Sequence, residues 1–183
     1  AASSQQFTWF DETLTHGQIV AIVKPTNELA TLTEWDLQEI FPALRRSLRA
    51  HYAALYYVDL VRHAITDADP HPTLWDCLLA ALRTLDSLHD PLPVTLVQQW
   101  ATLRESGYQP RLEQPPGGAR SMTFDPATGT LSTTPGDAPD PSWGVRRETV
   151  DLLRALEAAS DRAQAFEIAR GAAPPTLDRA NRL

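Results

Sequence analysis

The chain has 183 residues, of which 43% are hydrophobic, and a formal net charge of −7 at pH 7. This length is enough for one sizeable hydrophobic core, and the negative charge argues against tight non-specific binding to DNA by the chain as a whole. Its apolar runs fall well short of the roughly 20 residues that cross a bilayer. The single cysteine, Cys77, excludes an internal disulfide and a zinc site built from cysteines. These features favour a cytoplasmic protein without membrane contact.

The N-terminal part contains one clear strand signal. Residues 18–24, QIVAIVK, are rich in β-branched side chains and are bounded by Gly17 and Pro25, which is typical of a strand. Because a lone strand leaves its backbone groups without partners, we expect it to pair with a segment outside this chain or with one that the pattern does not reveal. Residues 31–41 are predicted to form a short helix or turn, with Thr33 as its cap.

The rest of the chain has mainly helical periodicity. Apolar residues spaced by three and four, among them Leu44, Leu48 and Tyr52, predict a long helix from Ala43 to Ile65 that begins next to Pro42. Gly107 is well placed to end the third helix of the series. The same periodicity predicts helices at residues 73–87, 93–106, 146–159 and 162–169, and a further one beginning at Pro174.

Residues 107–142 differ in character, because proline, glycine, threonine and aspartate dominate them. Within this segment, residues 121–133 (SMTFDPATGTLST) predict a small β-hairpin with its turn near Pro126–Gly129. The predicted fold class is therefore mainly α: a helical bundle with one small hairpin and one N-terminal strand.

The sequence contains few patterns typical of catalytic or metal-binding sites. The five histidines lack the spacing of a helical zinc site, and the sequence has neither a phosphate-binding loop nor a nucleophile elbow. Cys77 lies on the apolar face of a predicted helix, where a thiol behaves as a small hydrophobic group. Asp67, Asp69 and Asp76 leave two interpretations open: caps of the following helix, or the carboxylates of a small cytoplasmic enzyme.

A group of arginines is the strongest lead to a function. Arg45, Arg46 and Arg49 lie close together at the start of the long predicted helix. The forked guanidinium group suits both phosphate and carboxylate. Three interpretations follow: a solvated helix face, contacts to a nucleic-acid backbone, or a receptor for an acidic peptide.

Residues 32–87 run from a Leu-Thr-Glu segment through a proline-led, arginine-rich helix and an acidic turn with His-Pro into a helix of leucines and alanines. This order, with GYQPRL at residues 107–112 and the later helices of residues 144–183, resembles the RecO family of DNA repair proteins. The resemblance implies that residues 1–30 are the remnant of an N-terminal OB-fold, whose last strand is residues 18–24. It also implies that residues 31–183 form a RecO-like helical C-terminal domain, with residues 107–142 as a degenerate zinc-ribbon insert.

Many members of that family carry a four-cysteine zinc site in this insert. The corresponding positions here hold Pro115, Gly118, Thr133 and Gly136, so we expect no metal and no other cofactor. Without zinc, packing must hold the insert together. We expect a small apolar cluster beneath it, formed by Leu112, Met122, Phe124 and Leu131.

The resemblance further implies a non-enzymatic recombination mediator, cytoplasmic and associated with the nucleoid. Its expected partners are DNA, RecR and the acidic C-terminal tail of single-stranded DNA-binding protein, and its expected role includes loading of RecA. Because most of the OB-fold is missing, we expect this chain alone to bind DNA weakly. The net charge also leaves open a structural interaction module without DNA binding.

The long helix that begins at Ala43 is the predicted receptor for that acidic tail. We expect its arginines to take carboxylates and its apolar residues to take the apolar end of the tail. The predicted receptor residues are Arg45, Arg46, Arg49, Leu44, Leu48 and Tyr52.

Overall fold

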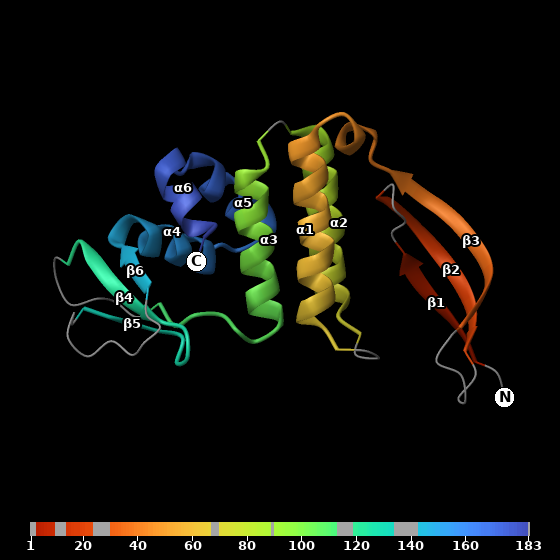
Figure 1. Cartoon of the computed structure of the whole chain (residues 1–183), viewed down its shortest axis with the longest axis horizontal. Coiled ribbons are helices and arrows are strands. Elements are labelled where there is room, and N and C mark those ends of the chain that lie inside the picture. Colours follow the sequence, from red (N-terminus) through yellow and green to blue (C-terminus); the bar gives the residue numbers. More distant parts are fainter. Residues whose placement is uncertain are drawn as a thin grey trace.

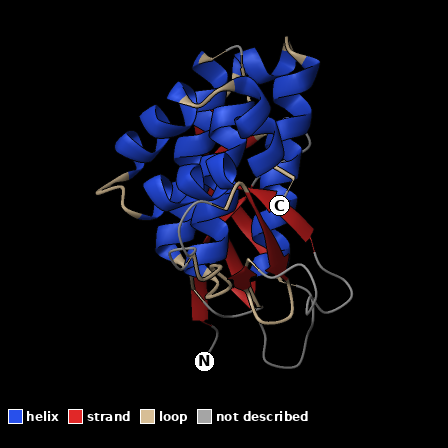
Figure 2. Ribbon diagram, turned by 90° about the vertical axis from the view of Figure 1, so that its left-hand side faces the viewer, coloured by secondary structure: helices blue, strands red, loops and turns tan. Residues whose placement is uncertain are grey.

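The computed structural model describes residues 3–9, 14–23, 30–66, 70–88, 90–112, 119–133 and 143–182. This part of the chain is mostly helical, as predicted, but it also contains two small sheets. Figure 1 shows an N-terminal sheet at one end, three long helices in the middle, and the remaining helices with the second sheet at the other end. Seen from the latter end, helices make up the bulk of the molecule (Figure 2).

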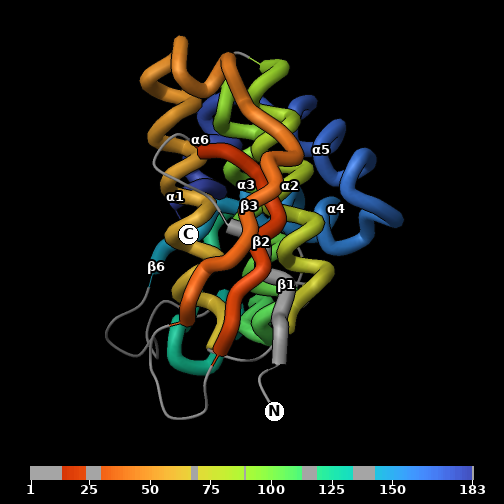
Figure 3. Tube along the Cα trace, turned by 90° about the vertical axis from the view of Figure 1, so that its right-hand side faces the viewer, coloured from red at the N-terminus to blue at the C-terminus, as the bar shows by residue number. Residues whose placement is uncertain are grey.

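The N-terminal sheet has three antiparallel strands in the order β1 (Ser3–Trp9), β2 (Thr15–Val23) and β3 (Thr31–Ile40). The predicted strand at residues 18–24 is confirmed as part of β2, although Lys24 lies outside the described residues. Its partners belong to this chain, so the expectation of a single N-terminal strand is wrong. Figure 3, which views the sheet end, shows β2 and β3 running side by side in front of the helices.

The prediction of a helix or turn at residues 31–41 is also wrong, and two β-bulges explain why. The pairing of β2 with β3 leaves Thr33 and Gln38 as extra residues on β3. The large apolar residues of β3 are therefore spaced by three, two and three, which resembles a helical period. All of them nevertheless lie opposite alternate residues of β2, in the pairs Leu32–Ala21, Trp35–Ile19, Leu37–Gly17 and Ile40–Thr15.

Two kinds of contact attach this sheet to the helices. Leu14 and Phe41, which flank the strands, are buried in the same hydrophobic cluster as the inner faces of α1 (Leu48–Ala64) and α2 (Pro72–Ser87). Arg83 of α2 also holds the carboxylate of Glu39 on β3. Its Nε donates to Oε1 at 3.0 Å and to Oε2 at 2.9 Å, and its Nη2 donates to Oε2 at 2.7 Å.

The Glu39–Arg83 pair predicts a pH-dependent contribution to stability. The hydrogen bond from Arg83 holds the pKa of the Glu39 carboxyl below its ordinary value. The pair therefore stabilises the fold above the unfolded-state pKa, and this contribution is lost as the pH falls through the lowered folded-state pKa. Because the Arg83 side chain is 53% exposed, we expect at most about 1 kcal/mol. In urea unfolding, Glu39→Gln should lower stability at neutral pH and match the unsubstituted protein in acid; a difference that persists in acid contradicts this.

The three long helices α1, α2 and α3 (Leu92–Glu105) lie next to one another, and the predicted helices at residues 73–87 and 93–106 are confirmed within one residue. Tyr57 of α1 is fully buried and its hydroxyl lies 2.7 Å from Thr95 Oγ1 of α3. Gly107 ends α3 as predicted, with a φ of +78°. There Tyr108 N donates to the carbonyl of Leu103 at 2.8 Å, which completes a Schellman cap.

The later helices are α4 (Arg147–Glu157), α5 (Arg162–Gly171) and α6 (Pro174–Ala180), all close to their predicted positions. They pack on the other face of α3 through a second cluster that includes Leu96, Trp100 and Leu153. Asp161 caps α5, since its carboxylate accepts from the amide of Gln164 at 2.8 Å.

The second sheet has the order β5 (Thr130–Ser132), β4 (Ser121–Asp125) and β6 (Trp143–Arg146). The predicted hairpin is confirmed, whereas β6 was not predicted. Asp125 shapes the turn by accepting from Ala127 N and Thr128 Oγ1. The expected apolar cluster is confirmed as well: Met122, Val145 and Val150 are buried, with Leu112, Phe124 and Leu131 packed against them.

Candidate partner-binding surface

The arginine-rich segment begins with a short 3-10 helix, η1 (Pro42–Arg45), and not with the first turn of a long helix. Asp86 at the end of α2 accepts hydrogen bonds from Ala43 N at 2.6 Å and Leu44 N at 3.3 Å, which fixes this turn. Ser47 then caps α1 by accepting from Ala50 N at 3.3 Å. The predicted helix start at Ala43 is therefore wrong, and Arg45 and Arg49 do not share one helix face.

The inner and outer faces of α1 differ from those expected. Its buried residues are Ala50, Ala54, Tyr57 and Val61. Leu48 and Tyr52 lie on the opposite side of the helix and are 70% and 63% exposed. Both therefore lie on the surface, while small side chains and Tyr57 fill the core-facing positions of α1.

Leu44 differs from Leu48 and Tyr52 in the exposure of its side chain. It is completely buried in η1 and belongs to the main hydrophobic cluster together with Phe41 and Leu85. It is therefore a core residue and does not line a surface for a partner. The predicted receptor residues that remain on the surface are Arg45, Arg46, Arg49, Leu48 and Tyr52, here called the α1 surface.

The three arginines of the α1 surface are exposed and form no ion pair with any residue in the described part of the chain. Several other arginines have such partners: Arg83 binds Glu39, Arg104 binds Glu105 and Arg170 binds Glu167. The charge of the α1 surface is thus free to meet an external anion, whether a carboxylate or a phosphate.

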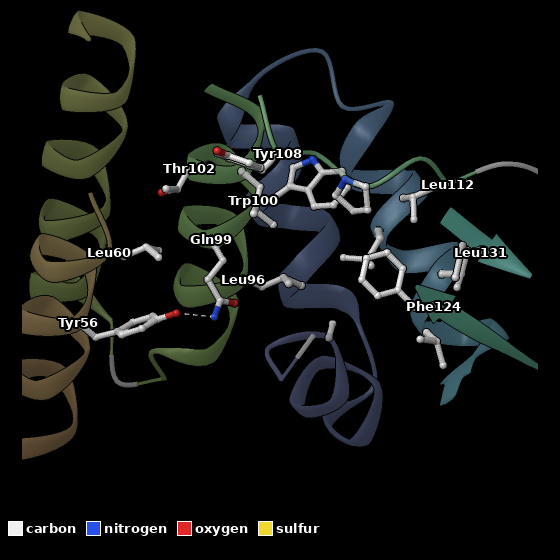
Figure 4. Close-up of a pocket in the computed structure, with 16 residues that line it drawn as sticks. Tyr56, Leu60, Leu96, Gln99, Trp100, Thr102, Tyr108, Leu112, Phe124 and Leu131 are labelled. Atoms are coloured by element: carbon white, nitrogen blue, oxygen red, sulfur yellow. Dashed lines mark hydrogen bonds between the residues drawn. The ribbon is translucent and has the colours of Figure 1, made fainter. Parts of the chain in front are cut away.

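A pocket of about 290 Å³ lies between α1, α3, α4 and the second sheet (Figure 4). Apolar side chains dominate it, with Tyr56 and Leu60 from α1, Leu96 and Leu103 from α3, and Phe124 and Leu131 from the sheet. Gln99 Nε2 donates to Tyr56 Oη at 2.9 Å across one side of the pocket (Figure 4).

The sequence did not indicate this pocket, because its lining comes from segments that are distant along the chain. Tyr56 lies one helical turn beyond Tyr52, so α1 connects the α1 surface with the pocket. The only local signal was Tyr108, an aromatic residue directly after the helix-ending Gly107, which remains 79% exposed.

The candidates for catalysis or metal binding find no support in the described residues. Among these, no three His, Cys, Asp or Glu side chains are grouped so as to hold a metal ion. Asp76 is exposed on α2, and Asp67 and Asp69 lie outside the described residues. Cys77 is half-buried, and its backbone carbonyl accepts from Arg162 Nη1 of α5. None of the described helices is long and apolar enough to span a bilayer.

Of the four positions that correspond to zinc-binding cysteines, only Thr133, next to β5, is described. Pro115, Gly118 and Gly136 lie outside the described residues. We expect elemental analysis of the purified protein to find no stoichiometric zinc, because threonine, proline and glycine side chains do not ligate it. One zinc per chain, retained through dialysis against a chelator, would contradict this expectation.

Residues 45–173 match the family model described as Recombination protein O C terminal. The chain is 31% identical over 96 residues to a DNA repair protein RecO of Rhodopirellula baltica, an alignment that covers 52% of this chain and 36% of that protein. It is 34% identical over 148 residues to a DNA repair protein RecO of Anaeromyxobacter dehalogenans, covering 78% of this chain and 56% of that protein. The chain thus corresponds to part of the length of each relative.

The family match extends from the end of η1 through α5 and includes the α1 surface, the second sheet and most of the pocket lining. The order of helices and hairpin that the resemblance implied is the one observed. The chain therefore belongs to the RecO family, whose members act in DNA repair and recombination as non-enzymatic mediators.

Proposed function

We propose that this chain is the partner-binding part of a recombination mediator, and that its α1 surface receives the acidic C-terminal tail of single-stranded DNA-binding protein. The observation that carries the proposal is the combination of three arginines without ionic partners among the described residues and two large apolar side chains left exposed beside them. Association with RecR and help in loading RecA are part of the same proposal for the whole protein.

The physical argument starts from the exposure of Leu48 and Tyr52. They are one helical turn apart, so together they form a continuous apolar strip on α1. Arg45 and Arg46 precede the strip and Arg49 lies within its first turn. An acidic tail with an apolar end can place its carboxylates on the guanidinium groups and its apolar end on the strip, which buries apolar area that otherwise faces water.

Fluorescence anisotropy with a labelled tail peptide tests this proposal. Arg45→Ala combined with Arg49→Ala should weaken binding by about 10- to 100-fold, because each guanidinium supplies a charge-assisted hydrogen bond in a partly desolvated contact. Tyr52→Ala should weaken it as well, through the loss of apolar contact. Binding of the unsubstituted chain should also fall as salt concentration rises.

Arg62→Ala is the matched control, since Arg62 is an exposed arginine near the other end of the same helix. It removes one charge from α1 and should leave binding nearly unchanged. If Arg62→Ala and the Arg45/Arg49 double variant lower the affinity for the tail peptide equally, the effect reflects the overall charge of the chain. That result would contradict a specific site on the α1 surface. Unchanged binding in the double variant would also contradict it.

An interaction module without DNA binding is a second candidate, favoured by the net charge of −7. The two candidate functions differ in whether the chain binds single-stranded DNA. The mediator proposal expects weak binding by this chain that disappears at moderate salt, because few phosphates are neutralised. Complete absence of binding at low salt would favour the interaction module.

A further inference from the structure

A second pocket, also of about 290 Å³, lies where β6 runs into α4 and α6 packs beside it. It is lined by Arg146, Arg179, Arg182, Trp143 and Thr149, together with Gly144 and Val145. None of these lining residues is acidic, and three are arginines. This concentration of positive charge is unusual in a chain whose formal charge is −7.

Two buried polar atoms in this pocket have no hydrogen-bond partner in the described part of the chain. Thr149 is 1% exposed, yet its Oγ1 has neither a donor nor an acceptor beside it. The Nε of Arg179 is likewise buried without a partner, although its Nη2 donates to Thr176 Oγ1 at 3.0 Å. Buried polar groups are costly when unpaired, so a ligand whose atoms reached these two groups would relieve that cost.

The start of α4 adds free backbone amides to the pocket, and Glu148 places one exposed carboxylate in the same turn. α4 has 11 residues, and its N-cap residue, Arg146, makes no side-chain capping bond. Thr149 is the third residue of this helix, so it lies in the turn whose amides lack intrahelical acceptors. Arginine groups, a hydroxyl and a helix start together are suited to a tetrahedral oxyanion.

Trp143 indicates which oxyanion the pocket fits. Its side chain is 42% exposed, and its ring lies 5.8 Å from that of Phe124. An exposed indole next to guanidinium groups is the arrangement that proteins use to stack a base while holding the adjoining phosphate. The pocket volume is also large compared with a bare phosphate ion.

We propose that this pocket holds a phosphodiester group of single-stranded nucleic acid, with a neighbouring base stacked on Trp143. One of these arginines, Arg182, already pairs with a carboxylate: Asp178 Oδ2 lies 2.5 Å from Arg182 Nη2. Both side chains are more than half exposed, so this ion pair is weak and Arg182 can exchange it for phosphate. The inference extends the proposed function, because it adds a nucleic-acid contact far along the chain from the α1 surface.

The test uses a labelled short oligothymidylate in low salt, followed by anisotropy, together with inorganic phosphate and thymidine monophosphate followed by NMR. Arg179→Gln combined with Arg182→Gln should weaken oligonucleotide binding by about tenfold or more and reduce its salt dependence. Trp143→Leu should weaken the oligonucleotide and the nucleotide but not inorganic phosphate. Thr149→Val, which keeps the side-chain shape, should weaken all three ligands and leave thermal stability at least unchanged.

Arg170→Gln is the matched control for charge, since Arg170 is an exposed arginine of α5 that pairs with Glu167. It should leave oligonucleotide binding nearly unchanged. The inference is overturned if the Arg179/Arg182 variant binds like the unsubstituted chain, if phosphate fails to shift the Trp143 and Thr149 signals, or if an acidic peptide occupies this pocket in preference to the oligonucleotide.

The Arg45/Arg49 variant separates this inference from the proposed function. Loss of tail-peptide binding in that variant, with oligonucleotide binding kept, supports two independent sites. Oligonucleotide binding that depends on Arg45 and Arg49 but not on Arg179 and Arg182 overturns the inference. Failure of the tail peptide to bind, while the phosphate pocket behaves as described, contradicts only the α1 receptor.

Discussion

Leu44→Ala is expected to lower the free energy of unfolding by about 2–5 kcal/mol, whereas Leu48→Ala should change it by less than about 0.5 kcal/mol. The two leucines are four residues apart, and the sequence pattern assigned both to the same face of one helix. In the structure Leu44 is fully buried in η1 and Leu48 is 70% exposed at the start of α1. Urea unfolding monitored by circular dichroism measures both values.

This pair is its own control, because the residue type, the substitution and the region of the chain are the same. A large loss from Leu48→Ala would mean that its side chain is buried, and it would remove the apolar strip from the proposed tail receptor. Equal small losses from both variants would contradict the position of η1 against the end of α2.

Gln98→Met is expected to stabilise the protein by about 1–3 kcal/mol, because it replaces an unpaired buried amide with an apolar group of similar size. Gln98 of α3 is fully buried, and neither atom of its amide has a hydrogen-bond partner in the described part of the chain. Thermal unfolding of the two proteins at one pH measures the difference.

The adjacent Gln99 provides the control. Its Nε2 donates to Tyr56 Oη at 2.9 Å and to the carbonyl of Asn181 at 3.3 Å. Gln99→Met should therefore lower stability, by about 1 kcal/mol, although the chemical change is identical. Destabilisation by Gln98→Met would show that its amide has partners, and it would contradict this assignment.

The helices could be predicted from the sequence because their signals are local. Proline within the first turn of α2, α3 and α6, glycine after α3, and apolar spacing all act within a few residues. The hairpin β4–β5 was predictable for the same reason, since Asp125 and the turn that follows fix it locally.

The beginning of α1 could not be predicted, because a distant residue determines it. Asp86, more than forty residues further along the chain, binds the amides of Ala43 and Leu44 and separates η1 from α1. Spacing alone therefore placed Leu44, Leu48 and Tyr52 on one helix face, whereas Leu44 is buried and the other two are exposed. Small residues, Ala50 and Ala54, allow the neighbouring helices to approach the other side of α1 instead.

The residues of the two candidate sites also differ in whether local sequence or distant contacts bring them together. Arg45, Arg46 and Arg49 are neighbours in sequence, so the sequence itself predicts their clustering. Arg146 and Arg179 line the same pocket only because α6 packs against α4. Neither periodicity nor composition predicts this contact between distant segments.

The bulges in β3 have a consequence for how copies of this chain behave in solution. β3 is an edge strand of its sheet, and the side chains of Leu32, Leu37 and Ile40 are each more than half exposed. A flat strand of this kind would be a template for pairing with a second molecule. The two extra residues bend and twist the edge, and Glu34 and Asp36 place exposed negative charges along it. With a formal charge of −7, copies of the chain also repel one another, so we expect the bulged and charged edge of β3 to disfavour strand pairing between copies.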